Sequence, residues 1–236
     1  MHQKRPMLEM HQIKEISESS PMEGLRLVSS FFPQGVVFST SLGQEDQVLT
    51  DMVCTENLPI NIFTLDTGRL FPEHYTLLAN NQARYKRKIH VYFPDQTQTE
   101  DYVNTHGING FYHSLENRKR CCYIRKVEPL NRALKGAKVW ITGLRSEQSE
   151  SREQLSVIEY DEQKQLYKYN PLLHWSYQEV LDYLKQQNVQ ELSLHSKGYI
   201  SVGCQPCTRP IVEGENPRAG RWWWEESHKE CGLHSN

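Results

Sequence analysis

The 236-residue chain lacks the features of a membrane, exported or general nucleic-acid-binding protein. No apolar run approaches the roughly 20 residues that a membrane-spanning helix needs. The first residues, MHQKRPMLEMHQ, are charged and have no apolar core of the kind found in signal peptides. The formal net charge is only −2, which argues against a protein that binds nucleic acid through a broad basic surface. These absences predict a cytoplasmic protein with neither a membrane nor a nucleic acid as its partner.

Two further absences concern the organisation of the chain. The sequence contains no internal repeat and no low-complexity segment. It also has no G-x-x-x-x-G-K-[ST] loop, the phosphate-binding loop of ordinary nucleotide triphosphatases. The length suits one α/β domain. We expect residues 1–207 to form this domain and residues 208–236 to be a C-terminal tail that belongs to it.

Strand-like and helix-like segments alternate through most of the chain. This alternation predicts a parallel sheet with helices on both faces, and such sheets bind ligands beyond the carboxyl ends of their strands. Residues 156–160 and 165–170 are expected to form a peripheral hairpin. Apolar and β-branched runs predict strands at 35–40, 60–66, 88–93 and 138–143, and helical periodicity predicts helices at 46–54, 72–85, 123–134 and 176–188.

Three of the predicted strands end in polar turns that contain glycine. STSLGQED follows the first strand, and Ser39, Ser41 and Gly43 can present hydroxyl and backbone N–H groups to an anion. LDTGRLFP follows the second strand, where Gly68 permits close approach of the backbone. GLRSEQSESR follows the fourth, and its two arginines can clamp phosphate or sulfate oxygens. Each turn alone fits an ordinary loop, but their convergence predicts one anion-binding site.

Four of the six cysteines form two pairs. Cys121 and Cys122 are adjacent, and Cys204 and Cys207 form a CQPC motif. Four thiolates from two distant segments suit either zinc or an iron–sulfur cluster. Adjacent cysteines fit the separate irons of a cubane better than two corners of one small tetrahedron. The spacing therefore favours a [4Fe–4S] cluster over zinc, and the late position of CQPC disfavours a thioredoxin-type redox pair.

The segment around the adjacent cysteines, KRCCYIRK, is strongly basic. A [4Fe–4S] unit with four thiolates carries about −2 formal charge. The four flanking cations can offset this charge, although a solvated helix end is the plainer explanation. These cations are Lys119, Arg120, Arg125 and Lys126.

Cys231 has no partner cysteine and follows a basic, aromatic run, NPRAGRWWWEESHKE. A thiol in such a setting is a candidate nucleophile, and His234 is near enough in sequence to hold the thiolate or to bind an anion. Arg218 and Arg221 can meet an anionic substrate there. A stray exposed thiol is the alternative. Cys54 lies on the first predicted helix, where we expect a buried, apolar role.

Seven ordered motifs together resemble the assimilatory adenylyl-sulfate reductases, the cluster-bearing branch of the phosphoadenylyl-sulfate reductase family. The motifs are STSLGQED, LDTGRLFPE, KRCCYIRK, TGLRSEQSESR, GCQPCTRP, RAGRWWW and ECGLH, and they cover nearly the whole chain. The resemblance implies an adenine-nucleotide α-hydrolase-like fold, related to the PP-loop ATPases. It also implies thioredoxin-dependent reduction of adenylyl sulfate to sulfite and AMP, in sulfate assimilation and cysteine biosynthesis. Thioredoxin or glutaredoxin would be a separate protein, and a homo-oligomer is left open.

The resemblance assigns a role to each motif. Cys231 would be the nucleophile and carry an S-sulfocysteine intermediate. Ser146 stands where many relatives have a second arginine, so one phosphate or sulfate contact is expected to be weaker. The cluster ligands would be Cys121, Cys122, Cys204 and Cys207. The substrate-binding residues would be Ser39, Ser41, Gly43, Leu65, Asp66, Thr67, Gly68, Lys126, Arg145, Arg152, Arg218, Arg221 and His234.

Three alternatives keep part of this interpretation. The first is the same reaction on 3′-phosphoadenylyl sulfate. The second is a cluster-bearing PP-loop enzyme that transfers sulfur, although STSLGQED departs from the S-G-G-x-D-S-like loop that it needs. The third is a zinc-stabilised nucleotide-binding module without catalysis.

Overall fold

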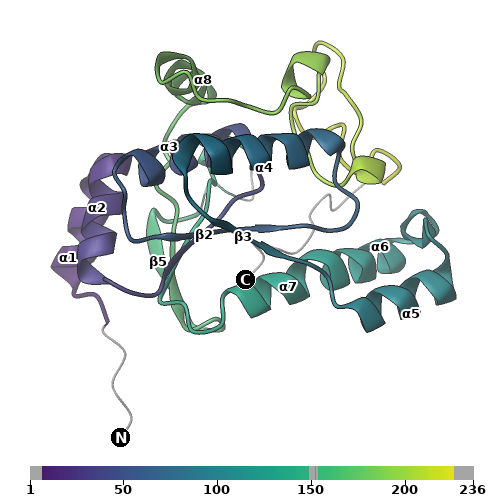
Figure 1. The fold of residues 1–236 in the computed structure, drawn as a ribbon, viewed down its shortest axis with the longest axis horizontal. Helices are drawn as coiled ribbons and strands as arrows, with labels where there is room; N and C mark the ends of the chain where they lie inside the picture. The colour runs from purple at the N-terminus through teal and green to yellow at the C-terminus, as the bar shows by residue number, and fades with distance from the viewer. Residues whose placement is uncertain (1–6, 149–151, 153, 226–236) are drawn as a thin grey trace, which may run out of the picture.

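A six-stranded β-sheet organises the part of the chain that this computed structural model describes, residues 7–148, 152 and 154–225 (Figure 1). The strands lie in the order β3-β2-β1-β4-β6-β5. Neighbouring strands are parallel except for β5 and β6, which are antiparallel. The strands are β1 (Val36–Ser39), β2 (Asn61–Leu65), β3 (Ile89–Tyr92), β4 (Val139–Ile141), β5 (Ile158–Asp161) and β6 (Leu166–Tyr169).

The chain changes its direction across the sheet at β1. From β1 it moves outward to β2 and β3, and it returns to the other side of β1 with β4. Val37 of β1 lies beside Trp140 of β4, and Ser39 of β1 lies beside Phe63 of β2. Ligands of parallel α/β sheets bind at such a switch point, outside the carboxyl ends of the strands. The fold therefore places the expected site at the ends of β1 and β4.

One face of the sheet carries the main hydrophobic core (Figure 1). Leu49 of α3 and Val180 of α8 are fully buried in it, and α1 and α2 cover the end of the sheet near β5. The helices present apolar stripes to this core, as their periodicity requires, and α8 packs on α3 (Figure 1). Ser176 and Glu179 form the predicted capping box of α8. The helices of this layer are α1 (Met10–Glu18), α2 (Pro21–Phe31), α3 (Gln44–Thr55), α4 (Pro72–Tyr85) and α8 (Tyr177–Gln186).

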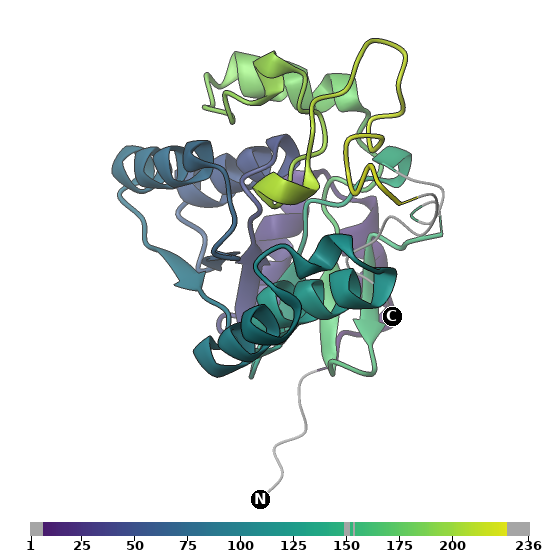
Figure 2. The same ribbon diagram turned by 90° about the vertical axis from the view of Figure 1, so that its right-hand side faces the viewer.

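The opposite face carries a smaller core beneath a continuous helical segment (Figures 1 and 2). Leu130 and Leu134 from this segment belong to the same buried cluster as Phe63, Trp140 and Leu166 of the sheet. The helices that cover this face follow β3 in the chain. They are α5 (Gln96–His106), α6 (Leu115–Cys122), a π-helical turn (Tyr123–Val127) and α7 (Glu128–Ala133).

Beyond position 203 the chain is packed but irregular. A 3-10 turn (Gln205–Cys207) opens this C-terminal segment, and Thr208 and Arg221 form an antiparallel bridge. Trp222 is only 1% exposed. The described part of the predicted tail, residues 208–225, thus folds onto the rest of the chain. The division between residues 1–207 and 208–236 stays a prediction.

The structure confirms the alternation of strands and helices and the mainly parallel sheet. The prediction of a peripheral hairpin was wrong for its second strand, because β6 lies inside the sheet between β4 and β5 and is buried throughout. Pairing with β4, a distant segment, decides this position, so no local pattern could indicate it. The helices α1, α2, α5 and α6 were not predicted. None of the described helices is both long and apolar enough to cross a membrane.

Candidate active site

The turn after β1 is fixed by a carboxylate at the start of α3. Asp46 accepts hydrogen bonds from the Ser41 backbone N–H at 2.6 Å and from the Ser41 hydroxyl at 2.7 Å. Gly43 is the residue that precedes α3. Ser39 accepts a hydrogen bond from the Trp140 indole N–H at 2.8 Å. The Ser39 hydroxyl has no acceptor among the described residues, so it is available to donate to a ligand.

The turns after β1 and β4 meet at Asp46. Burial of this side chain raises the pKa of its carboxyl from 3.8 to about 6, and the hydrogen bonds from Ser41 oppose the shift only in part. A side chain at Gly143, in the turn after β4, would collide with the carboxylate. The two polar turns therefore converge, as expected from their places at neighbouring strand ends.

The raised pKa of Asp46 predicts a pH-dependent contribution to stability. The folded chain binds this proton more tightly than the unfolded chain, so the contribution is complete below pH 3.8 and is lost as the pH rises through about 6. Urea unfolding of the wild type and of Asp46→Asn at several pH values checks this. The free energy of unfolding of the wild type should fall relative to the variant by up to about 3 kcal/mol between pH 4 and 7. A difference that does not change with pH would contradict the assignment.

The turn after β2 is held in one shape by its own side chains. Asp66 accepts hydrogen bonds from the Gly68 N–H at 2.8 Å and from the Tyr75 hydroxyl at 3.1 Å. Gly68 has a φ of +69°, a value that favours glycine. Leu65 ends β2 and is half-buried. The four residues 65–68, all expected to bind the substrate, thus form a single ordered turn.

The same turn contacts both cysteine-bearing segments. The Thr67 carbonyl accepts a hydrogen bond from Arg125 at 2.7 Å, and the Thr67 hydroxyl oxygen lies 3.3 Å from the Cys204 sulfur. One residue further on, the Arg69 carbonyl accepts a hydrogen bond from the Gln205 N–H at 2.8 Å. The turn predicted to bind the nucleotide is therefore bonded directly to the segments predicted to bind a metal.

The four cysteines of the two pairs line one cavity, with about 380 Å³ of space free of protein atoms in and around it. Cys121 and Cys122 come from the end of α6, whereas Cys204 and Cys207 lie at the 3-10 turn of the C-terminal segment. Figure 2 shows this turn close to the helical segment that begins with α6. Trp222 packs against the cysteines from the C-terminal side. The structure thus brings together all four predicted metal ligands around one space, the cysteine cavity.

Basic side chains surround the cysteine cavity. Arg118, Arg125 and Lys126 are among its lining residues. Arg118 is fully buried and forms an ion pair with Glu225 at 2.7 Å. Glu225 offsets the charge of Arg118, but Arg125, which is also buried, and Lys126 add further positive charge at the cavity. The cavity is therefore suited to a negatively charged occupant.

The cations act most strongly on one thiol of the CQPC motif. Burial tends to raise the pKa of Cys204, but Lys126, the hydrogen bond with Thr67 and nearby arginines together hold that pKa below its ordinary value. At Cys207 burial prevails, with Cys204 adding to it, and the pKa rises to about 12. Burial also raises the pKa of Cys121. No three His, Cys, Asp or Glu side chains in the described ranges are placed to hold a single metal ion.

Two of the cations expected to offset a cluster were wrongly chosen. Lys119 and Arg120 are exposed and do not line the cysteine cavity. Arg118 lies there instead, because it is four residues before Cys122 and so shares its helix face. This four-residue spacing is the sequence signal that could have identified Arg118.

The arginines of the turn after β4 are engaged by protein groups. Arg145 forms ion pairs of 2.9 Å with Glu45 and with Glu147. Arg152 donates a hydrogen bond to the side chain of Gln148. Ser146, at the position noted for a missing arginine, donates its hydroxyl to a backbone carbonyl at 3.0 Å. The substrate-binding roles of Arg145 and Arg152 stay predictions, and an incoming anion would have to compete with Glu45 and Glu147 for Arg145.

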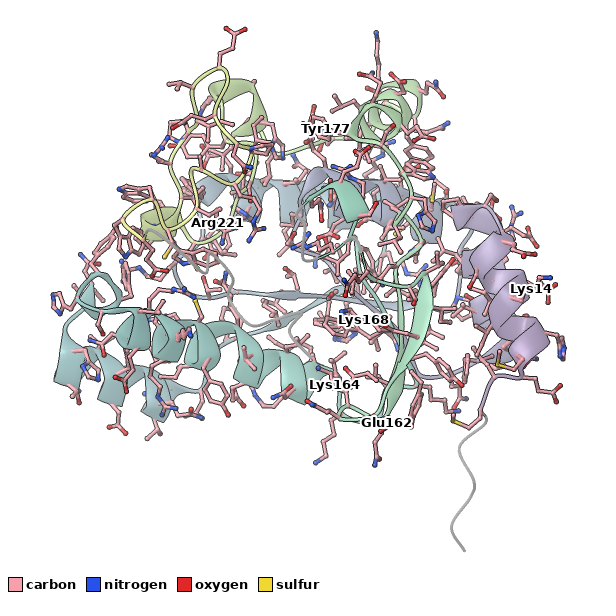
Figure 3. The ribbon with its side chains drawn as sticks, turned by 180° about the vertical axis from the view of Figure 1, so that it is seen from behind. Lys14, Glu162, Lys164, Lys168, Tyr177 and Arg221 are labelled. Carbon is pink, nitrogen blue, oxygen red and sulfur yellow. The ribbon has the colours of Figure 1, made fainter. Side chains whose placement is uncertain are left out.

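The C-terminal segment places one predicted arginine beside Trp222, which lines the cysteine cavity. The guanidinium of Arg221, labelled in Figure 3, stacks on Trp222 at 4.6 Å, and that of Arg118 stacks on the same ring at 4.7 Å. Arg218 is half-buried. The predicted nucleophile Cys231 and the predicted anion ligand His234 lie outside the described residues.

Comparison with known proteins gives concordant results. The sequence model of the phosphoadenosine phosphosulfate reductase domain matches residues 35–210. A protein of Allochromatium vinosum named adenosine 5′-phosphosulfate reductase is 50% identical over 200 residues, 84% of this chain and 78% of the relative. A protein of the same name from Burkholderia cepacia is 49% identical over 84% of this chain and 80% of the relative.

Solved structures show the same relationship at the level of the fold. The structure of phosphoadenylyl-sulfate (PAPS) reductase from Candida auris in a phosphate complex superposes with a TM-score of 0.73 and 28% identity, over 86% of this chain and 98% of that one. Yeast FAD synthetase in complex with FAD superposes with a TM-score of 0.55 and 16% identity, over 89% of this chain and 70% of that one. The second match concerns the fold alone, and it relates the sheet to that of an enzyme with an adenine dinucleotide bound.

Proposed function

This chain belongs to the phosphoadenosine phosphosulfate reductase family, and from that premise we propose that it reduces adenylyl sulfate to sulfite and AMP. Relatives that share about half of its residues carry the name of this activity. The reaction would serve sulfate assimilation and cysteine biosynthesis in the cytoplasm, with thioredoxin or glutaredoxin as the separate thiol donor. This assignment accounts for the polar turns at the sheet edge and for the two cysteine pairs.

One observation carries the proposal: the turn after β2 is hydrogen-bonded to both cysteine-bearing segments. Thr67 contacts Arg125 and Cys204, and Gln205 donates to the Arg69 carbonyl. A nucleotide bound at the carboxyl ends of the strands would therefore have its anionic end next to the basic edge of the cysteine cavity. An adenylate whose reactive group is an anion fits this arrangement.

The residues of the cysteine cavity fit a [4Fe–4S] cluster. Cys121, Cys122, Cys204 and Cys207 would hold it, each on a different iron, so their sulfurs need to surround a space rather than converge on one point. Zinc would require all four sulfurs at about 2.3 Å from a single ion. When bound, the cluster supplies negative charge and cross-links α6 to the C-terminal segment. The buried Arg118 and its basic neighbours are the matching positive charges.

The chemical steps need only thiols from the protein and its partner. The Cys231 thiolate would attack the sulfur of adenylyl sulfate, forming an S–S bond while the S–O bond to phosphate breaks and AMP leaves. A thiolate of thioredoxin would then attack the Cys231 sulfur and release sulfite, leaving a mixed disulfide. The second thiol of thioredoxin would resolve this disulfide, so the two thiols supply both electrons and Cys231 returns to its thiol form.

The cations of the site would stabilise charge during the first step. Negative charge builds on the phosphate oxygen as the S–O bond breaks, and fixed positive groups favour that state. Lys126 lines the cysteine cavity and follows Cys122 by four residues, so it would lie between the cluster and the substrate. Arg218, Arg221 and His234 would contribute from the C-terminal side.

A turnover assay on both adenylyl sulfates tests the proposed substrate. The chain, purified without oxygen and supplied with thioredoxin, should release sulfite from adenylyl sulfate faster than from 3′-phosphoadenylyl sulfate, by about tenfold or more in kcat/KM. The relative of known structure with 28% identity is named for the second substrate, whereas the relatives near 50% identity are named for the first. A preference for the 3′-phosphorylated substrate would overturn the choice between them.

A further inference from the structure

Lys168 is a buried charged residue that the proposed mechanism does not use. It lies in β6, inside the sheet, and is only 1% exposed. Side chains alternate along a strand, so Lys168 shares the face of Leu166, which belongs to the smaller core against α7. In Figure 3 Lys168 lies in the interior of the molecule, whereas Lys164 is at the edge, near the turn between β5 and β6.

The ammonium of Lys168 has no hydrogen-bond acceptor and no ion-pair partner within the described ranges. Its contact is with the ring of Trp140, whose centroid lies 5.8 Å from the nitrogen. Burial lowers the pKa of Lys168, while the two nearby acids, Glu159 and Asp161, are countered by Lys164 and Arg152. A buried ammonium without an acceptor is costly for the fold, so its presence requires an explanation outside stability.

Trp140 connects Lys168 to the turn after β1. Its indole N–H donates to the Ser39 hydroxyl oxygen at 2.8 Å, and its ring faces the Lys168 ammonium. The Ser39 hydroxyl and the Lys168 ammonium are thus two free donors held by one aromatic side chain, on the face of the sheet that carries the predicted site. Arg152, near enough to influence the pKa of Lys168, is a predicted ligand of the same anion.

We propose that Lys168 is a further substrate-binding residue, whose ammonium contacts the phosphosulfate of the bound adenylate from the sheet side. This inference rests on the proposed function, because it takes the anion to be that of adenylyl sulfate. Lys126 and the C-terminal arginines approach the same anion from the side of the cysteine cavity. The two groups of cations enclose the reacting group between the sheet and α6.

Binding measurements on Lys168→Met test this role directly. The replacement keeps the length and apolar character of the side chain and removes only the charge. Isothermal titration of the cluster-loaded, full-length chain with AMP, adenylyl sulfate and neutral adenosine is made in the Cys231→Ser background, in which bound adenylyl sulfate is not consumed. We expect affinity for the two anionic ligands to fall about 10- to 100-fold, and affinity for adenosine to stay within about threefold.

Two matched variants separate an anion contact from a structural role. Lys168→Arg should keep affinity for AMP and adenylyl sulfate within about tenfold of the parent, since it restores the charge. Lys164→Met removes an exterior lysine of the same hairpin and should leave all three affinities unchanged. Without ligand, Lys168→Met should melt at or above the temperature of the parent, because it removes an unpaired buried charge.

The outcomes divide clearly. The proposal is supported if Lys168→Met loses affinity for AMP and adenylyl sulfate but not for adenosine, and if Lys168→Arg recovers that affinity. The proposal would be overturned if Lys168→Met bound all three ligands as tightly as the parent, or if its affinity for adenosine fell as much as its affinity for the anionic ligands. Either result would leave the proposed function unaffected. A parent chain that binds neither AMP nor adenylyl sulfate would overturn the proposed function and this inference together.

Discussion

Replacing Cys231 with serine is expected to abolish the release of sulfite from adenylyl sulfate while leaving the iron content unchanged. Serine keeps the shape of the side chain, but its hydroxyl is a far weaker nucleophile at neutral pH than a thiolate. We expect turnover to fall by at least about 10⁴-fold. Sulfite release under steady-state conditions and iron content per chain are the two measurements.

A second readout isolates the first chemical step. With 35S-labelled adenylyl sulfate and no thioredoxin, the wild type should retain label on the protein as S-sulfocysteine, and Cys231→Ser should retain none. Cys54→Ser is the matched control, because Cys54 lies on α3 against the main core, far in the fold from the cysteine cavity. Full turnover in Cys231→Ser would exclude the proposed nucleophile.

Replacing Cys204 with alanine is expected to remove the iron. Cys204 is buried, contacts Thr67 at 3.3 Å, and is the thiol whose pKa the surrounding cations lower. Its loss would take away one of the four proposed ligands and loosen the link between the turn after β2 and the C-terminal segment. Iron and acid-labile sulfide should fall to a small fraction of the wild-type content, with turnover reduced by at least about 100-fold.

The metal content of the protein distinguishes between an iron–sulfur cluster and a zinc site at the four cysteines. Wild-type protein purified without oxygen should contain about four irons and four sulfides per chain and absorb broadly near 400 nm. The far-ultraviolet circular dichroism of Cys204→Ala should keep the helical signal of the parent, and Cys54→Ser should keep the iron. One zinc per chain, without sulfide, would show that the cysteine cavity is a structural zinc site.

The sequence was informative where local chemistry decides the structure. The turns after β1, β2 and β4 were predicted from glycine, serine and aspartate at strand ends, and the structure shows two of them meeting at Asp46. The two cysteine pairs were predicted to share one site, and they line one cavity. In each case the signal was a cluster of special residues at the end of a regular element.

The sequence failed where a distant segment decides the environment of a side chain. The run QLYKYN suits an outer strand with its lysine in solvent, yet pairing with β4 places Lys168 in the interior. Arg118 looks like an ordinary helix-surface arginine until the C-terminal segment brings Glu225 and Trp222 against it. Burial of a charge depends on contacts that are distant along the chain. The four-residue spacing to Cys122 could have indicated the helix face of Arg118, but the burial of neither side chain could be predicted from neighbouring residues.

The turn after the cysteine pair is π-helical, so the number of residues in it matters as much for the structure as their identity. Its hydrogen bonding skips one residue more than in an α-helix, with the Glu128 N–H donating to the Tyr123 carbonyl. Tyr123 itself is 43% exposed, so its side chain is open to substitution. Deleting it is a different matter, because an α-helical turn holds one residue fewer than this π-helical turn. The shortened turn would close to an α-helix, which would change how Arg125 and Lys126 are placed relative to the cysteine pair. The segment therefore tolerates changes of identity much better than a change of count.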